Sequence, residues 1–272
     1  MLKQRILTGA GITVVLSLVI IFSHIPWVLG TLIACLSMQA IYELYRAVGL
    51  KDNKPLYLTS CAVALLLSII NIPGYEYIVV IVFVSAVALF LYLMLNVKTL
   101  RRIDAWMAVC IAVMVVCSFK CMSAIRAMEK GVFLLGMAVL VPVLTDIFAY
   151  LIGKQCGKHR LFPSISPKKT VEGAIGGLAY AVGFILLIAA ILMRCQVIQV
   201  ELEQLITYVI FASLIGQFGD FALSSVKRIV GIKDYGALLP GHGGILDRFD
   251  SLLFVLPFTY LFCLCAGPIL FY

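Results

Sequence analysis

Charged residues are scarce in this chain of 272 residues: lysine, arginine, aspartate and glutamate together make up only 12% of it. A soluble domain carries about a quarter charged residues and about half apolar ones. Here 63% of the residues are hydrophobic, which is more apolar surface than a water-soluble protein of this size is able to bury. The composition therefore excludes an ordinary soluble enzyme and predicts a protein whose solvent is the bilayer.

Several patterns typical of catalytic or cofactor-binding proteins are also missing. There is no GxSxG nucleophile motif, no Walker A ending in GKS or GKT, and no CxxC pair among the nine cysteines. Most of the cysteines lie inside apolar runs, where packing is their usual role. These absences argue against nucleophilic catalysis, a P-loop nucleotide site and a disulfide or thiolate–metal framework.

Nine apolar segments are long enough, or nearly so, to cross a bilayer, which takes about 20 residues per helix. Each should be helical, because an unpaired backbone group in lipid costs several kcal/mol. The predicted fold class is therefore an all-α polytopic membrane protein with about nine transmembrane helices. The segments are residues 5–23, 27–45, 56–72, 76–96, 104–122, 131–152, 172–193, 205–222 and 251–271.

The lysines and arginines predict the orientation of these helices, because cytoplasmic loops carry an excess of both. With nine spans and a cytoplasmic N-terminus, 17 of the 21 basic residues fall on the inner side and the C-terminus lies outside. An even number of spans would remove this bias from half of the chain. We therefore expect a multi-pass protein of the cell membrane.

The two halves of the chain differ in their polar content. Residues 1–130 form an N-terminal region of about five transmembrane helices without a chemical motif. Residues 131–272 form a C-terminal region whose predicted cytoplasmic loops, 153–171 and 223–250, combine bases with acids, glycines, serines and histidines. Orientation requires only the bases, so we expect the catalytic region here, with its active site at the cytoplasmic face.

Carboxylates inside or beside apolar runs are the most informative residues of this region. An ionised aspartate near the bilayer centre costs about 2.5–3.5 kcal/mol, so it usually has a partner or a task. For Asp146 and Asp220, a buried ion pair with a lysine or arginine is the alternative to a functional role. Helical spacing places a polar stripe at the end of one span, made of Gln217, Asp220, Ser224 and Lys227.

A glycine-rich segment, GHGGILDRFD, precedes the last apolar run. Glycines let a backbone approach a ligand closely, and free amides at a helix start favour phosphate oxygens. We expect Gly243 and Gly244 to contact phosphate, and His242 to contact phosphate or hold the loop. A glycine-rich turn alone also fits an ordinary loop, but the acids that follow favour a metal–phosphate site. Mg²⁺ prefers one or two carboxylates, waters and substrate phosphates, and Asp220 and Asp247 are its predicted ligands.

A second polar segment, SISPKKTVEG, covers residues 164–173. Either Ser166 or Thr170 is suited to cap the helix that follows, and Glu172 falls in its first turn. A cap with lysines that only fix topology is one interpretation. The other is a cationic clamp on a polyphosphate, formed by Lys168 and Lys169. Bases of the other loop would complete this clamp: Lys227, Arg228, Lys233 and Arg248.

Residues 224–250 resemble the signature of the phosphatidate cytidylyltransferases, also called CDP-diacylglycerol synthases. The segments TDIFAYLIGK, SPKKTVEG and GQFGD extend the resemblance over about 140–255. The matching signature positions are Ser224, Lys227, Arg228, Lys233, Asp234, Gly236, Pro240, His242, Gly243, Gly244, Asp247, Arg248 and Asp250.

The resemblance implies the reaction CTP + phosphatidate → CDP-diacylglycerol + diphosphate in the cytoplasmic membrane. It also implies a divalent cation on Asp220 and Asp247, a K⁺ ion beside the Mg²⁺, and a homodimer. Catalytic roles are expected for the two metal ligands with Asp250, Lys227, Arg228 and Arg248. Substrate contacts are expected for Ser166, Lys168, Lys169, Thr170, Glu172, Ser224, Lys233, Asp234, His242, Gly243, Gly244 and Asp146.

Two other functions are weighed against this one. A different lipid-linked nucleotidyl or phosphoryl transferase also places acids and bases at a cytoplasmic face, but the unbroken order of the signature argues against it. A transporter using Asp146 and Asp220 as ion sites predicts polar residues spread across the bilayer, whereas here they cluster at one face. No nucleic-acid partner is expected.

Overall fold

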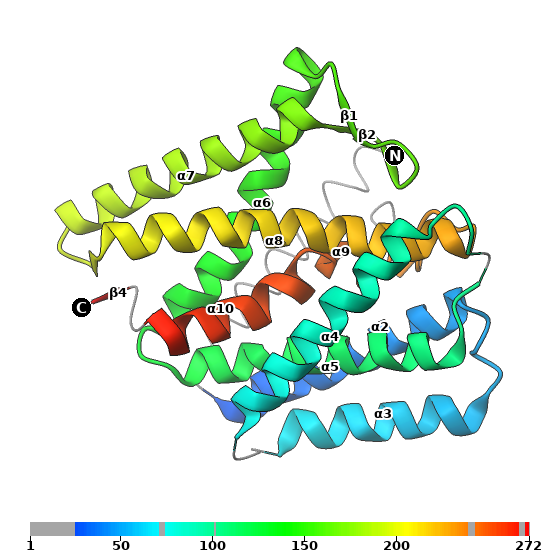
Figure 1. Cartoon of the computed structure of the whole chain (residues 1–272). Coiled ribbons are helices and arrows are strands. Elements are labelled where there is room, and N and C mark those ends of the chain that lie inside the picture. Colours follow the sequence, from blue (N-terminus) through cyan, green and yellow to red (C-terminus); the bar gives the residue numbers. More distant parts are fainter. Residues whose placement is uncertain (1–24, 71–73, 101, 239–242, 267–269, 272) are drawn as a thin grey trace.

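The chain folds into a bundle of long helices, which a computed structural model describes for residues 25–70, 74–100, 102–238, 243–266 and 270–271 (Figure 1). The predicted span at 5–23 lies outside the described residues. Within them, six helices are long and apolar enough to cross a membrane, judged by length and composition. They are α2 (Pro26–Ala47), α4 (Tyr75–Leu95), α5 (Ala105–Ala127), α6 (Gly131–Cys156), α7 (Val171–Arg194) and α8 (Leu202–Ile229). The all-α, polytopic class is thereby confirmed.

Two further apolar helices are shorter than the spans predicted for them. The helix α3 (Lys54–Ile69) has 16 residues and α10 (Leu252–Ala266) has 15. The last predicted span, 251–271, is preceded by a separate four-residue helix, α9 (Leu246–Phe249), and a turn joins the two. This break leaves Asp250 and Ser251 in a turn between the two helices, while Asp247 and Arg248 lie in the short helix α9.

The region predicted as loop 153–171 is partly regular. Helix α6 continues to Cys156, and a hairpin follows in which β1 (Arg160–Phe162) pairs antiparallel with β2 (Ser166–Thr170). The Phe162 ring packs against Phe221 of α8 with centroids 5.1 Å apart, and Arg228 Nε donates to the Ile165 carbonyl at 2.9 Å. The lysine-bearing strand is therefore held against α8. The contact between Phe162 and Phe221 and the hydrogen bond from Arg228 to the Ile165 carbonyl fix the hairpin against α8. Sequence periodicity predicts neither contact.

Helix α8 is longer than the predicted span 205–222 and continues to Ile229. The polar stripe that begins at Gln217 therefore remains helical to its last member, Lys227, as its spacing indicated. A second small pairing, β3 (Gln199–Val200) with β4 (Leu270–Phe271), lies at the opposite end of α8. In Figure 1, α7 and α8 lie side by side and antiparallel, with the β1–β2 hairpin at one end.

Close approach of α6 and α7 sets the position of the hairpin. A Cβ atom added to Gly177 of α7 would lie 2.6 Å from the Thr145 carbonyl oxygen, and one added to Gly173 would lie 2.6 Å from that of Ala149. Backbones this close leave no room for a side chain. The small residues thus bring Thr170, which caps α7 by accepting a bond from the Gly173 amide at 3.2 Å, directly beside α6.

The core lies around α5, which contacts helices from both halves of the chain. Phe119 packs edge-on against Phe249 at 5.4 Å, and Ser118 Oγ donates to the Leu253 carbonyl at 2.6 Å. Figure 1 shows α2, α3 and α5 grouped on one side of the molecule, with α7 and α8 on the other. The N-terminal helices therefore support the α9–α10 segment that carries the predicted acids.

Candidate active site

A cavity of about 1320 Å³ opens where α2, α6, α7, α8 and α9 meet. One part of its wall is apolar and is formed by α2, α5 and α6, with residues Leu29, Leu32, Leu36, Met122, Leu135, Val139 and Val143. The other part is charged and carries Asp146, Lys154, Arg160, Lys168, Lys169, Asp220, Asp247, Arg248 and Asp250. A cavity with one apolar and one highly charged wall suits an amphipathic ligand whose polar part is anionic.

Lys169 is at the centre of the charged wall. Its ammonium contacts a carboxylate oxygen of Asp220 and lies 3.7 Å from Asp146 Oδ1, and it sits 4.8 Å from the centroid of the Phe221 ring. Burial lowers the pKa of Lys169, but the carboxylates of Asp220 and Asp146 outweigh it and raise that pKa above its ordinary value. The group is therefore a fixed positive charge at neutral pH.

The alternative interpretation of the two helical aspartates is thus realised in part, because Asp146 and Asp220 both pair with a lysine. The pairing does not remove them from the site, since all three residues line the cavity. Ser224 Oγ donates to Asp220 Oδ1 at 3.3 Å, and Gln217 bonds the Ala174 carbonyl of α7. The stripe predicted on α8 therefore faces protein and cavity.

Asp247 is held by a different set of donors and its side chain is only 2% exposed. Lys227 Nζ donates to Asp247 Oδ1 at 3.0 Å, while the backbone amides of Tyr235 and Gly244 donate to Oδ2 at 2.8 and 2.9 Å. Charge-assisted bonds of this kind are stronger than neutral ones. Asp247 thus fixes the end of α8 and the glycine-rich segment to each other.

Asp250 completes the group of acids on the cavity wall. It follows α9, and its Oδ1 accepts a bond from the Ser251 amide at 2.8 Å. Burial and the neighbouring Asp220 carboxylate raise the pKa of Asp250 well above its ordinary value. The neighbouring carboxyl groups of Asp220 and Asp250 do not both ionise readily. Their proximity therefore favours binding of a cation beside them.

Only some of the predicted clamp bases face the cavity. Lys168, Lys169 and Arg248 line it, together with Lys154 and Arg160, which the sequence interpretation left out. The other predicted bases do different work: Lys227 pairs with Asp247, and Arg228 bonds the backbone of Ile165 and Ile232. Lys233 and Asp234 are exposed and do not line the cavity. His242 lies outside the described residues.

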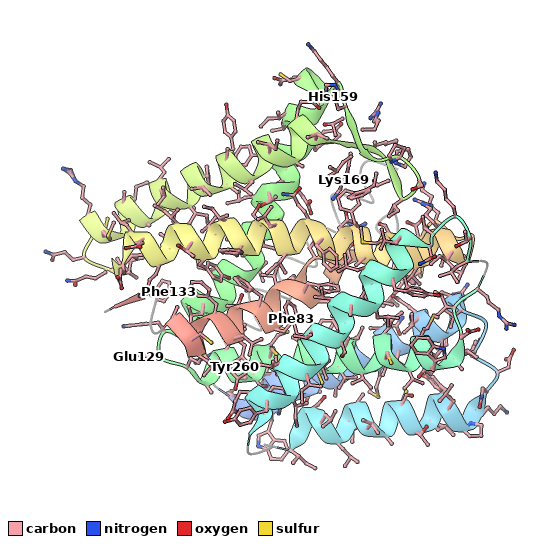
Figure 2. All side chains as sticks on the ribbon, in the orientation of Figure 1. Phe83, Glu129, Phe133, His159, Lys169 and Tyr260 are labelled. Carbon is pink, nitrogen blue, oxygen red and sulfur yellow. The ribbon has the colours of Figure 1, made fainter. Side chains whose placement is uncertain are left out.

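Glu172 sits in the first turn of α7, as expected, but it binds back to the chain before the hairpin. Its carboxylate accepts bonds from the amides of Lys158 and His159 and lies 2.6 Å from His159 Nδ1. Figure 2 shows His159 at the outer tip of the molecule and Lys169 on the inner side of the hairpin, facing α8. Glu172 therefore closes the base of the hairpin, whereas Thr170, rather than Ser166, caps the helix.

The glycine-rich segment differs from the prediction in one respect. We expected free amides there for phosphate, but the amides of three consecutive residues are already bonded to carboxyl groups. Gly244 donates to Asp247, and Ile245 and Leu246 donate to Glu43 of α2 at 3.0 Å each. The difference arises because a buried acid from the N-terminal region reaches this segment.

Besides Lys154 and Arg160, sequence reasoning missed Glu43 and Tyr235, which bond to residues of the site. Glu43 is 2% exposed and lies in the region described as lacking a motif. Its signal was present, since it is a carboxylate inside the apolar run 27–45, which is the criterion that singled out Asp146. Tyr235 carried no signal, because its contribution is its backbone amide together with a hydroxyl bond to the Leu223 carbonyl at 2.9 Å.

Comparison with known proteins identifies the family of the chain. Residues 3–266 match the Cytidylyltransferase family. The chain belongs to this family. A phosphatidate cytidylyltransferase of Bacillus subtilis (strain 168) is 34% identical over 268 residues, which is 95% of this chain and 96% of the relative. Those of Staphylococcus saprophyticus and Staphylococcus aureus (strain COL) are 46% and 48% identical over 129 and 130 residues, 47% of this chain and 48% of each relative.

Membership of the cytidylyltransferase family makes this chain a nucleotidyltransferase and confirms the family resemblance of the signature. It also agrees with the membrane character of the helices. Family members transfer a cytidylyl group, so the basic residues of the charged wall are suited to a nucleoside triphosphate. The apolar wall remains available for the hydrophobic part of a second substrate.

The donor set of the charged wall is compatible with a magnesium ion of the kind expected. Among the described residues, no group of three His, Cys, Asp or Glu side chains converges at metal-binding distance. That excludes an all-protein cage within this part of the chain, but Mg²⁺ typically takes one or two carboxylates and fills its other positions with water and phosphate oxygens. Asp220 and Asp247 both line the cavity. In this structure Lys169 pairs with Asp220, and Lys227 and two backbone amides bond to Asp247, so a magnesium ion on these two acids would take the place of some of these donors.

Proposed function

We propose that this protein transfers the cytidylyl group of CTP to phosphatidate and releases diphosphate. The observation that carries the proposal is the cavity of about 1320 Å³, in which an apolar wall continues into a wall of acids and bases. Phosphatidate joins two acyl chains to a phosphate, so both walls match one molecule. The three relatives are all phosphatidate cytidylyltransferases, which supports the same assignment.

The chemistry needs little proton transfer. An oxygen of the phosphatidate phosphate attacks the α-phosphorus of CTP in line, a new P–O bond forms, and the bond between the α-phosphorus and the bridging oxygen to the β-phosphate breaks. Diphosphate leaves with the electron pair of that bond. Because the attacking phosphate is already an anion, no strong general base is required, and catalysis consists of positioning and charge stabilisation.

The main obstacle is repulsion between two polyanions, and the bases on the cavity wall oppose it. Lys168 and Arg248 are exposed and able to reach a triphosphate. Lys169 is held by Asp220 and Asp146 at the centre of the wall. Mg²⁺ bound by Asp220 and Asp247 would neutralise charge on the phosphate oxygens. A K⁺ ion beside the Mg²⁺ is the second cation that the family resemblance implies.

Two further features belong to the proposal. The active site faces the cytoplasm, where CTP is made, as the distribution of lysine and arginine predicts. The protein works as a homodimer, as the resemblance to the family implies. Exposed apolar residues of α7, among them Ile175, Leu187 and Ile191, provide surface either for lipid or for a second copy.

The test is a purified, detergent-solubilised protein incubated with labelled CTP, phosphatidate and Mg²⁺. We expect CDP-diacylglycerol and diphosphate in equal amounts. We expect Asp247→Asn and Asp220→Asn to lower turnover on the order of 100-fold, since loss of groups that hold or orient a metal typically costs 10–100-fold. Chelation of Mg²⁺ should abolish turnover of the unaltered protein.

Asp104→Asn serves as the matched control, because Asp104 precedes α5, pairs with Arg102 and does not line the cavity. It should retain normal turnover. Melting temperatures of all variants identify a loss caused by unfolding. The proposed substrate is contradicted if the unaltered protein is inactive with phosphatidate but active with another lipid phosphate or alcohol. The metal assignment is contradicted if Asp247→Asn has normal turnover.

A further inference from the structure

Glu43 makes an unusual long-range contact in the structure. It lies in the last turns of α2, is 2% exposed, and bonds to a segment more than 200 positions later in the chain. Its Oε1 accepts the Ile245 amide and its Oε2 accepts the Leu246 amide, both at 3.0 Å. Gln39, one helical turn earlier, donates to Oε1 at 3.0 Å. Both oxygens of the buried carboxyl group are therefore used.

Two glycines make room for this carboxyl group. A Cβ atom added to Gly236 would lie 2.7 Å from Glu43 Oε1, and a Cβ added to Gly244 would overlap the same carboxyl group. Real Cβ atoms are essentially never found this close to another atom. Two segments distant from α2 in sequence thus converge on a single side chain, and a Cβ atom at either contact position would require the Glu43 carboxyl group to move.

The contact bears directly on the charged wall of the cavity. Leu246 immediately precedes Asp247, whose own carboxylate accepts the Gly244 amide at 2.9 Å. The amides of residues 244, 245 and 246 are therefore fixed from two sides, by Asp247 and by Glu43. A buried amide left without a partner is strongly disfavoured, so this segment loses its present conformation if Glu43 is removed.

We propose that Glu43 is a positioning residue for the transfer reaction: it holds the segment 244–246 so that Asp247 and Arg248 face the cavity. This inference rests on the proposed function for what the cavity does. Glu43 does not itself line the cavity, and so it acts through the segment it binds. Residues 1–130, which carry no signature motif, thereby contribute a residue on which the site depends.

If Glu43 served only to stabilise the bundle, its loss would lower the stability of the whole protein. Helix α2 is anchored independently by fully buried apolar residues such as Ile33 and Leu44, and by a bond of 2.8 Å between the hydroxyls of Tyr45 and Ser60. Loss of Glu43 therefore leaves most of the packing of α2 in place. The effect should appear in the segment 243–250 rather than in the stability of the whole bundle.

The first experiment measures hydrogen exchange of the detergent-solubilised protein without substrate. In Glu43→Ala we expect amides in a peptide covering 243–250 to exchange roughly ten-fold faster or more, with peptides from α7 unchanged. Glu43→Asp should behave in the same way, because a side chain shorter by one methylene does not reach both amides. Glu203→Gln, an exposed acid in the first turn of α8, is the control and should change neither region.

The second experiment measures turnover against Mg²⁺ concentration. We expect Glu43→Ala to lower kcat about 10- to 100-fold and to raise the Mg²⁺ concentration for half-maximal activity, as when a group that orients a metal ligand is lost. Gly236→Ala should lower activity in the unaltered background but have no further effect in Glu43→Ala, because the clash is then relieved. Such non-additivity is the mark of residues in direct contact.

Unchanged exchange at 243–250 in Glu43→Ala overturns the inference. The inference is also overturned if Glu43→Ala lowers the melting temperature but leaves both the Mg²⁺ dependence and the effect of Gly236→Ala as they are in the unaltered protein. Failure of the proposed function looks different. In that case the unaltered protein makes no CDP-diacylglycerol, yet Glu43→Ala still increases exchange at 243–250.

Discussion

At the scale of single residues, the structure separates two adjacent lysines that the sequence treats alike. Lys169 is partly buried and pairs with Asp146 and Asp220, whereas Lys168 is exposed at the cavity. Lys169 thus belongs to the resting architecture of the site, and Lys168 is free to meet an incoming phosphate.

We therefore expect two different outcomes from the same substitution. Lys169→Met leaves two carboxylates without their cation and should lower both the melting temperature and kcat/KM, the latter by about 10-fold or more. Lys168→Met should leave the melting temperature unchanged and raise the KM for CTP. Steady-state kinetics and thermal unfolding in detergent distinguish the two. Equal effects of the two variants, or a change confined to the KM for phosphatidate, would contradict these assignments.

Much of the charged wall was predictable from residue type and spacing. The stripe from Gln217 to Lys227 followed from helical periodicity, and the place before an apolar run indicated a cap but left Ser166 and Thr170 as alternatives, of which the structure shows Thr170. The partners were not predictable, because Lys227 binds Asp247 and Arg228 binds Ile165 through contacts between segments distant in sequence. Periodicity reports which face a side chain occupies, but the partner on that face depends on tertiary packing.

At the scale of elements, the packing of α6 against α7 determines where the hairpin and Lys169 sit. The two helices approach closely at Gly173 and Gly177, where an added Cβ would meet backbone oxygen atoms. Gly183, on the same helix, has no atom within 4 Å of its added Cβ. The sequence contains all of these glycines without indicating which of them lie at a helix contact.

Gly177→Leu and Gly183→Leu form a matched pair on α7. The first forces a side chain into a closed contact, and overpacking of this kind typically costs about 1–3 kcal/mol. For a chain of this size that corresponds to a fall in Tm of roughly 2–4 °C per kcal/mol. Gly177→Leu should therefore melt several degrees lower and lose activity, while Gly183→Leu melts like the unaltered protein. Comparable melting of the two would show that the α6–α7 contact is looser than described.

At the scale of the whole molecule, the fold keeps its charged chemistry at one end of an apolar bundle. Lys169 and the hairpin lie at one end of α7 and α8, while Glu129 and Tyr260 lie at the other (Figure 2). The fold class followed from the lengths of the apolar runs. The division of the last span at Asp250 did not, because hydropathy does not register a bend in which the Ser251 amide bonds to the Asp250 carboxylate.

The orientation of this bundle is the remaining prediction, and two native cysteines are placed to test it. Cys156 is exposed at the end of α6 beside the hairpin, and Cys195 is exposed just beyond α7 at its opposite end. If the lysine-rich loops face the cytoplasm, a membrane-impermeant maleimide added to intact cells should label a variant that retains only Cys195. The same reagent should label a variant that retains only Cys156 only after the cells have been permeabilised. Retained CDP-diacylglycerol synthesis in both variants shows that the substitutions leave the fold intact. The reverse pattern would place the charged wall of the cavity outside the cell, away from CTP, and would contradict both the orientation and the proposed reaction.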